Sequence, residues 1–131
     1  MCGIIGCVTT DSNTVPALLE GLRRVEYRGY DSAGLAVISG GKLSVRKTTG
    51  KIDDLRKLLE DDPVEGPTGV AHTRWATHGE PSCENAHPQT DCTGKIAVVH
   101  NGIVENHSSL RRRLEREGVE FTSDTDTEVI P

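Results

Sequence analysis

Short apolar runs, each bounded by glycine or polar residues, most limit what this chain can fold into. Aromatic residues make up only 3% of the 131 residues, so a core must rest on valine, isoleucine, leucine and alanine. One domain of ordinary size is the expected result. Four runs predict strands, of which the last two are expected to be buried: residues 3–8, 35–38, 69–73 and 96–100.

Turn and helix signals lie between these runs. A Gly40-Gly41 pair predicts a hairpin turn, and apolar spacing predicts helices after Asn13 or Thr14, near residues 52–59 and over residues 108–117. The pattern Thr125-Asp126-Thr127-Glu128 is typical of a capping box and predicts the start of a fourth helix.

Charge and cysteine content exclude several functions. The net charge of −5 leaves no basic surplus for phosphate, so we expect no nucleic-acid partner. No apolar run approaches the roughly 20 residues that span a bilayer, so we expect no membrane contact. Four cysteines without a secretory signal favour a cytoplasmic location. Cys83, His87 and Cys92 do not have the spacing of a zinc site, so no metal is expected.

The most reactive position is Cys2, which directly precedes the first predicted strand. Removal of Met1 would give this residue both a thiol and a free α-amino group. Their ordinary pKa values, about 8.5 and about 8, allow the amine to accept the thiol proton near neutral pH. Cys2 is therefore a candidate nucleophile, and the alternative is a buried structural cysteine.

A polar segment follows the third predicted strand. Within residues 72–81, Arg74 could hold a carboxylate with two hydrogen bonds, and Trp75 could shield a site. A surface ion pair for Arg74 and a plug at the edge of the core for Trp75 are equally acceptable interpretations.

Two further positions admit both structural and chemical interpretations. Asn101-Gly102 could form a hairpin turn, or could donate an amide and a backbone N–H to an oxyanion. Asp126 could serve the capping box, or could bind the ammonium group of a ligand.

In combination these motifs carry a family resemblance. The N-terminal Cys2, the run from Leu22 to Gly34, the segment 72–81, the run Val99–His107 and Thr125–Ile130 occur in order, with Asn85-Ala86-His87-Pro88 between them. The chain closely resembles, along its whole length, the glutaminase domain of the glucosamine-6-phosphate synthase family, the isomerizing glutamine–fructose-6-phosphate aminotransferases. Sister amidotransferases share the opening but not the internal runs.

The resemblance implies a role for each matching residue. Cys2 would attack the side-chain amide of L-glutamine, and Asn101 and Gly102 would form the oxyanion hole. Arg74 would bind the α-carboxylate of glutamine and Asp126 its α-ammonium group. Trp75, Thr77 and His78 would belong to a loop that closes over the substrate. No cofactor or metal is implied.

The resemblance also implies an α+β fold, an αββα sandwich of the N-terminal-nucleophile hydrolase type. Residues 2–131 would form a partial glutaminase domain whose second half is missing, without the isomerase domains of the parent enzyme. Uncovered apolar surface would then favour self-association. Alternatives are a catalytically inactive fragment, or the glutaminase part of another amidotransferase such as amidophosphoribosyltransferase.

Overall fold

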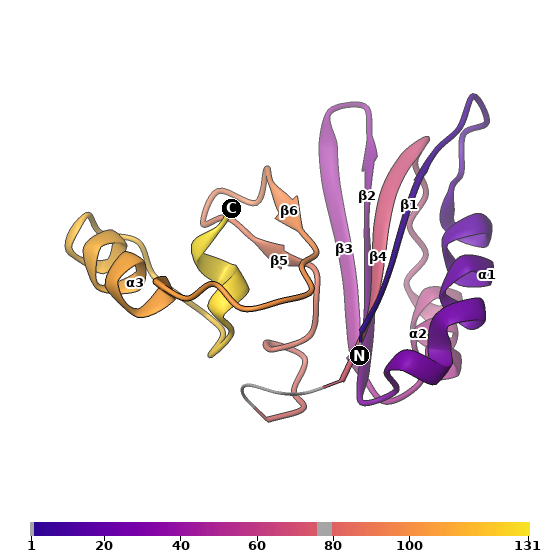
Figure 1. The fold of residues 1–131 in the computed structure, drawn as a ribbon. Coiled ribbons are helices and arrows are strands. Elements are labelled where there is room, and N and C mark those ends of the chain that lie inside the picture. Colours follow the sequence, from indigo (N-terminus) through magenta and orange to yellow (C-terminus); the bar gives the residue numbers. More distant parts are fainter. Residues whose placement is uncertain (1, 76–79) are drawn as a thin grey trace.

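A four-stranded antiparallel sheet forms the centre of the molecule in the computed structural model, which describes residues 2–75 and 80–131 (Figure 1). Its strand order is β1-β4-β2-β3, so β1 pairs with β4 at one edge. The strands are β1 (Gly3–Val8), β2 (Ser32–Ser39), β3 (Lys42–Thr49) and β4 (Thr68–Arg74).

Two helices cover one face of this sheet, α1 (Val15–Val25) and α2 (Ile52–Asp61), with a short 3-10 helix η1 (Glu26–Arg28) after α1 (Figure 1). Every third or fourth residue of each helix is apolar, which gives the helix one face to bury. The core between helices and sheet contains Leu18, Leu22, Leu35, Leu55 and Ala71, all without exposed surface.

The remaining elements lie on the other side of the sheet (Figure 1). These are β5 (Gln89–Thr90), β6 (Ala97–Val98), α3 (His107–Arg116) and a second 3-10 helix, η2 (Asp126–Val129). From one side of Figure 1 to the other, the layers are α1 and α2, the large sheet, the β5–β6 pair, and then η2 and α3. The predicted α+β fold is confirmed, with a second sheet of only two short strands. Within the described ranges, every helix is too short or too polar to cross a bilayer.

The hairpin turn and the first three strands agree with the sequence prediction. Gly40 and Gly41 adopt φ angles of +57° and +77°, the left-handed region that a tight hairpin turn requires. The fourth predicted strand was wrong in extent and burial, because β6 keeps only Ala97 and Val98 of residues 96–100, and both are half-buried. Its partner β5 offers only two residues for pairing.

The predicted start of a fourth helix is present only as the short 3-10 helix η2, and the predicted capping box was wrong. Thr125 precedes η2, but its side chain makes no capping hydrogen bond. The carboxylate of Glu128 turns back instead and accepts hydrogen bonds from the backbone N–H and hydroxyl groups of Thr122 and Ser123. At α1, Asn13 accepts a hydrogen bond from Val15 N–H, whereas Thr14 donates its hydroxyl to the Gly66 carbonyl.

A close backbone contact fixes the turn before β5 against the large sheet. The carbonyl oxygen of His87 occupies the space that a Cβ atom at Gly34 of β2 would fill. Lys47 of the neighbouring β3 donates from Nζ to the carbonyl oxygen of Glu84 at 3.2 Å. Glycine at position 34 therefore allows residues 84–87 to lie directly on the sheet.

Candidate active site

Cys2 lies where the edge strand β1 meets the end of β4. The pairing of Gly3 with Thr73 carries Cys2 to the last residues of β4. Its Sγ accepts a hydrogen bond from the Trp75 backbone N–H at 3.2 Å and lies 3.7 Å from the Trp75 carbonyl oxygen. The side chain is half-buried and borders a cavity, so the thiol can be reached by a small molecule.

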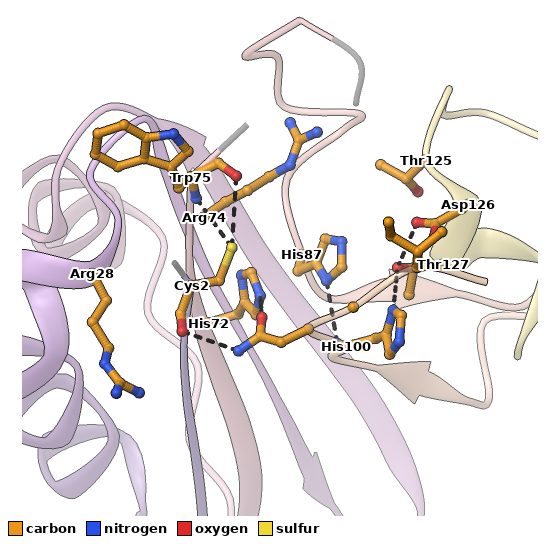
Figure 2. Close-up of a pocket in the computed structure, with 13 residues that line it drawn as sticks. Cys2, Arg28, His72, Arg74, Trp75, His87, His100, Thr125, Asp126 and Thr127 are labelled. Carbon is orange, nitrogen blue, oxygen red and sulfur yellow. Dashed lines mark hydrogen bonds between the residues drawn. The ribbon is translucent and has the colours of Figure 1, made fainter. Parts of the chain in front are cut away.

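The side-chain amide of Asn101 joins Cys2 to the large sheet. Its Nδ2 donates to the Cys2 carbonyl oxygen at 3.0 Å, and its Oδ1 lies 2.8 Å from Nε2 of His72 on β4 (Figure 2). An amide oxygen only accepts, so the His72 proton is on Nε2. An amide nitrogen has two hydrogens, so Nδ2 keeps one for a further acceptor.

Two buried imidazole rings also line the cavity, those of His72 and His87. The rings of His72 and His87 stack with centroids 4.3 Å apart. Burial lowers the pKa of His72 to about 4, and burial together with the nearby His72 and Arg74 lowers the pKa of His87 to about 3. Both rings are therefore neutral at pH 7. The backbone N–H of His100 donates to His87 Nδ1 at 3.4 Å, which places the proton of His87 on Nε2.

Gly102 follows Asn101 in a conformation that suits glycine. Its φ angle is +139°, within the left-handed region that residues with a Cβ atom rarely adopt. A Cβ atom there would also lie 3.1 Å from Nε2 of His100. The site thus has exposed backbone next to the Asn101 amide, and no hairpin strand follows Gly102.

A cation and an anion reach the same cavity from different layers. Arg74 ends β4 and is buried, and its main chain is approached closely by Gly29. Asp126 begins η2, and its Oδ2 accepts a hydrogen bond from the Val104 backbone N–H at 2.7 Å. Figure 2 shows Arg74 coming from the sheet and Asp126 from the segment beyond it. A ligand with adjacent negative and positive groups suits this pair.

The cavity has a volume of about 510 Å³. Six of the eight residues that the sequence predicts for the site line it: Cys2, Arg74, Trp75, Asn101, Gly102 and Asp126. The other two, Thr77 and His78, lie outside the described residues.

Other lining residues were not assigned a role from sequence. They are Arg28, His72, His87, His100, Ile103, Thr125 and Thr127. All seven lie within the motifs quoted above, so their nearness in sequence to the assigned residues was the available signal. Among the residues that the structure describes, no cluster of three or more histidine, cysteine or acidic side chains could hold a metal ion.

Sequence comparison identifies the family. The profile of the glutamine amidotransferase domain matches residues 53–131, which is more than half of the chain. The chain belongs to this family. Its sequence is 59% identical over 130 residues to the isomerizing glutamine–fructose-6-phosphate aminotransferase of Shewanella oneidensis, covering 99% of this chain and 21% of that protein. The protein of the same name from Methanothermobacter thermautotrophicus is 54% identical over 131 residues, covering 100% of this chain and 22% of that protein.

Two solved structures have the same fold. Glutamine phosphoribosylpyrophosphate amidotransferase from B. subtilis, complexed with ADP and GMP, superposes with a TM-score of 0.75 at 30% identity, covering 98% of this chain and 27% of that one. An allosteric regulatory enzyme of purine biosynthesis gives a TM-score of 0.74 at 32% identity, with the same coverage. This amidotransferase chain spans about a fifth of the length of its curated relatives.

Proposed function

We propose that this amidotransferase chain is the glutamine-hydrolysing part of an isomerizing glutamine–fructose-6-phosphate aminotransferase, in a partial glutaminase domain over residues 2–131. The observation that carries the proposal is that the Cys2 thiol, the Asn101 amide, Arg74 and Asp126 line one cavity. The four cysteines are all free, which fits a cytoplasmic protein.

The reaction begins with the thiol of Cys2 after Met1 has been removed. The α-amine of Cys2 takes the thiol proton, and the sulfur attacks the side-chain carbonyl carbon of glutamine. The resulting oxyanion accepts hydrogen bonds from the second hydrogen of Asn101 Nδ2 and from the Gly102 N–H. The ammonium group then protonates the leaving nitrogen, the C–N bond breaks, and ammonia departs from a γ-glutamyl thioester.

Water completes the cycle. The α-amine of Cys2 accepts a proton from water, the hydroxide attacks the thioester carbonyl, and the C–S bond breaks. The sulfur leaves as a thiolate and regains its proton from the ammonium group. Glutamine and water have become glutamate and ammonia, and no metal or organic cofactor takes part.

Substrate recognition uses the two charges at the cavity. Arg74 binds the α-carboxylate of glutamine with two hydrogen bonds, and Asp126 binds the α-ammonium group. Both groups are on one carbon atom of the substrate, so a cation and an anion that line the same cavity suit an α-amino acid. Trp75, Thr77 and His78 are proposed to contact the bound substrate.

The whole protein would use the released ammonia on a sugar phosphate. In this proposal, isomerase domains convert D-fructose 6-phosphate and the ammonia to D-glucosamine 6-phosphate, which serves the synthesis of UDP-N-acetylglucosamine. The identity of 54–59% to isomerizing aminotransferases supports this acceptor over phosphoribosyl pyrophosphate, because identity to the solved phosphoribosylpyrophosphate amidotransferase is only 30%.

Labelling of Cys2 tests the proposal. The Met1-free chain is treated with a diazoketone analogue of glutamine, and the modified residue is located by mass spectrometry. We expect a single adduct on Cys2, formed more slowly when glutamine competes, and ammonia release that is lost in Cys2→Ala. Cys7→Ala, a change in β1 outside the cavity, should leave both unchanged. An unmodified Cys2 in folded, Met1-free protein would refute the proposal.

A further inference from the structure

Asn85 has a buried side-chain amide whose two ends bind separate segments of the chain. Its side chain is only 3% exposed. Its Nδ2 donates to the Glu80 carbonyl oxygen at 3.0 Å, within the turn before β5. Its Oδ1 accepts a hydrogen bond from the Asp124 backbone N–H at 2.8 Å, 39 residues further along the chain. One side chain therefore connects two segments that are distant in sequence.

The first of these segments, the turn before β5 that contains Glu80 and Asn85, is fixed to the large sheet. Its His87 carbonyl fills the space above Gly34 of β2, and Lys47 of β3 donates to the Glu84 carbonyl. The sheet also carries Cys2 beside its edge strand and Arg74 at the end of β4.

The second segment carries Asp126. Asp124, which donates to Asn85, lies two residues before it. Glu128 closes the same segment by accepting four hydrogen bonds from Thr122 and Ser123, so residues 122–128 form one compact unit. Burial raises the pKa of Glu128, but hydrogen bonds from Ser123 and Thr122 outweigh burial and lower it, so the carboxylate stays charged. A displacement of Asp124 would therefore move Asp126.

We infer that Asn85 is a positioning residue that sets the distance between Arg74 and Asp126, and so the recognition of the α-ammonium group of the substrate. The inference rests on the proposed function. Asn85 does not touch the substrate; it ties the unit that carries Asp126 to the turn that lies on the sheet. An amide suits this place because it offers one donor and one acceptor, whereas alanine offers neither.

A comparison of two substrates separates positioning from general damage. L-glutamine has the α-ammonium group, and 4-carbamoylbutanoate is the same molecule without it. In Asn85→Ala we expect kcat/KM for glutamine to fall about tenfold, which corresponds to about 1.4 kcal/mol, while kcat/KM for 4-carbamoylbutanoate stays within about twofold. Asp126→Ala should reduce the same ratio, and the double variant should reduce it no further than Asp126→Ala alone.

Gln89→Ala is the matched control. Gln89 is an equally buried amide in the same region, but its Nε2 donates to the carbonyls of Glu84 and Ala86 within its own turn. We expect this control to preserve the substrate ratio. Asn85→Asp keeps an acceptor for the Asp124 N–H and should preserve most of the ratio.

Amide hydrogen exchange tests the inference without any activity. The Val104 N–H donates to Asp126, so its protection reports where Asp126 lies. In Asn85→Ala we expect the Asp124 and Val104 amides to exchange at least about tenfold faster, with the amides of β2 unchanged. Asn85→Ser, whose side chain is too short to bridge, replaces the alanine variant if that does not fold.

The possible results separate the role of Asn85 from the proposed function. Unchanged exchange at Val104, or equal losses for both substrates, would overturn the role of Asn85. If the parent chain hydrolyses neither substrate, the proposed function fails, and the exchange of Asp124 and Val104 still decides whether Asn85 positions Asp126.

Discussion

The substitution Asn101→Asp tests the amide at the centre of the site with the smallest change of shape. In the parent chain, Asn101 Oδ1 faces His72 Nε2 at 2.8 Å and Nδ2 donates to the Cys2 carbonyl at 3.0 Å. A carboxylate keeps the acceptor for His72 but replaces the donor with an oxygen. That oxygen faces the Cys2 carbonyl and the place of the developing oxyanion, so attraction becomes repulsion.

The expected loss is large for the reaction and small for the fold. Removal of one oxyanion donor costs about 10²–10³-fold in kcat, or about 3–4 kcal/mol. Loss of one ordinary hydrogen bond costs the folded state only about 1 kcal/mol, because Asn101 is exposed. The new carboxylate should also raise the pKa of His72 from its value of about 4, since it favours the charged ring.

Three measurements decide this case. Steady-state ammonia release gives kcat, urea titration gives the free energy of unfolding, and NMR titration of the His72 ring gives its pKa. Asn106→Asp makes the same chemical change at an exposed position before α3 and should alter none of them. A kcat for Asn101→Asp within threefold of the parent would refute the assignment of Asn101 to the oxyanion hole.

Three further predictions concern stability. Gly34→Ala should lower the free energy of unfolding by about 3 kcal/mol in urea titrations, because its Cβ would displace the His87 carbonyl, whereas Gly6→Ala, which has open space, should change it little. The pKa values of His72 and His87, lowered by burial to about 4 and about 3, mean that below pH 6.5 the unfolded chain takes up protons that the folded chain does not. The free energy of unfolding should therefore fall by on the order of 2 kcal/mol for each ring between pH 7 and pH 5. In His72→Gln, urea titrations across that range should show a smaller fall. Glu128→Ala removes the acceptor of four hydrogen bonds and should lower the free energy of unfolding by about 2–3 kcal/mol, seen as a lower Tm; an unchanged Tm would contradict the role given to this carboxylate.

Local patterns predicted the elements whose stability is local. The apolar stripe of α1 and the glycine pair of the β2–β3 hairpin are read from neighbouring residues, and both are found in the structure. The run 96–100 is as apolar as a buried strand, yet only two of its residues pair, because its partner β5 has only Gln89 and Thr90 to pair with. Glu128 fits a capping box by spacing, but its carboxylate bonds to Thr122 and Ser123, which precede the pattern.

The residues of the candidate site also differ in whether the sequence alone predicts their role. Residues of distinctive chemistry, such as Cys2 and Arg74, are recognisable from sequence motifs, and both line the cavity. The parts played by His72 and Asn85 depend on contacts across 29 and 39 residues. Whether a histidine is charged, or an amide spans two segments, is decided by packing, which no local pattern records.

The register of β1 explains how a residue at the start of the chain can be placed accurately. β1 is an edge strand whose only partner in the sheet is β4, and a slip of one residue would turn every side chain to the other face. Gly3 opposes such a slip: a Cβ atom there would collide with Val25 of α1 and press on Thr73, and the Gly3 N–H donates to Thr73 Oγ1 at 3.2 Å. Because only glycine fits beneath α1 at this point, the residue before it must emerge from the sheet beside Trp75. The position of the Cys2 thiol is therefore set by the absence of a side chain at its neighbour.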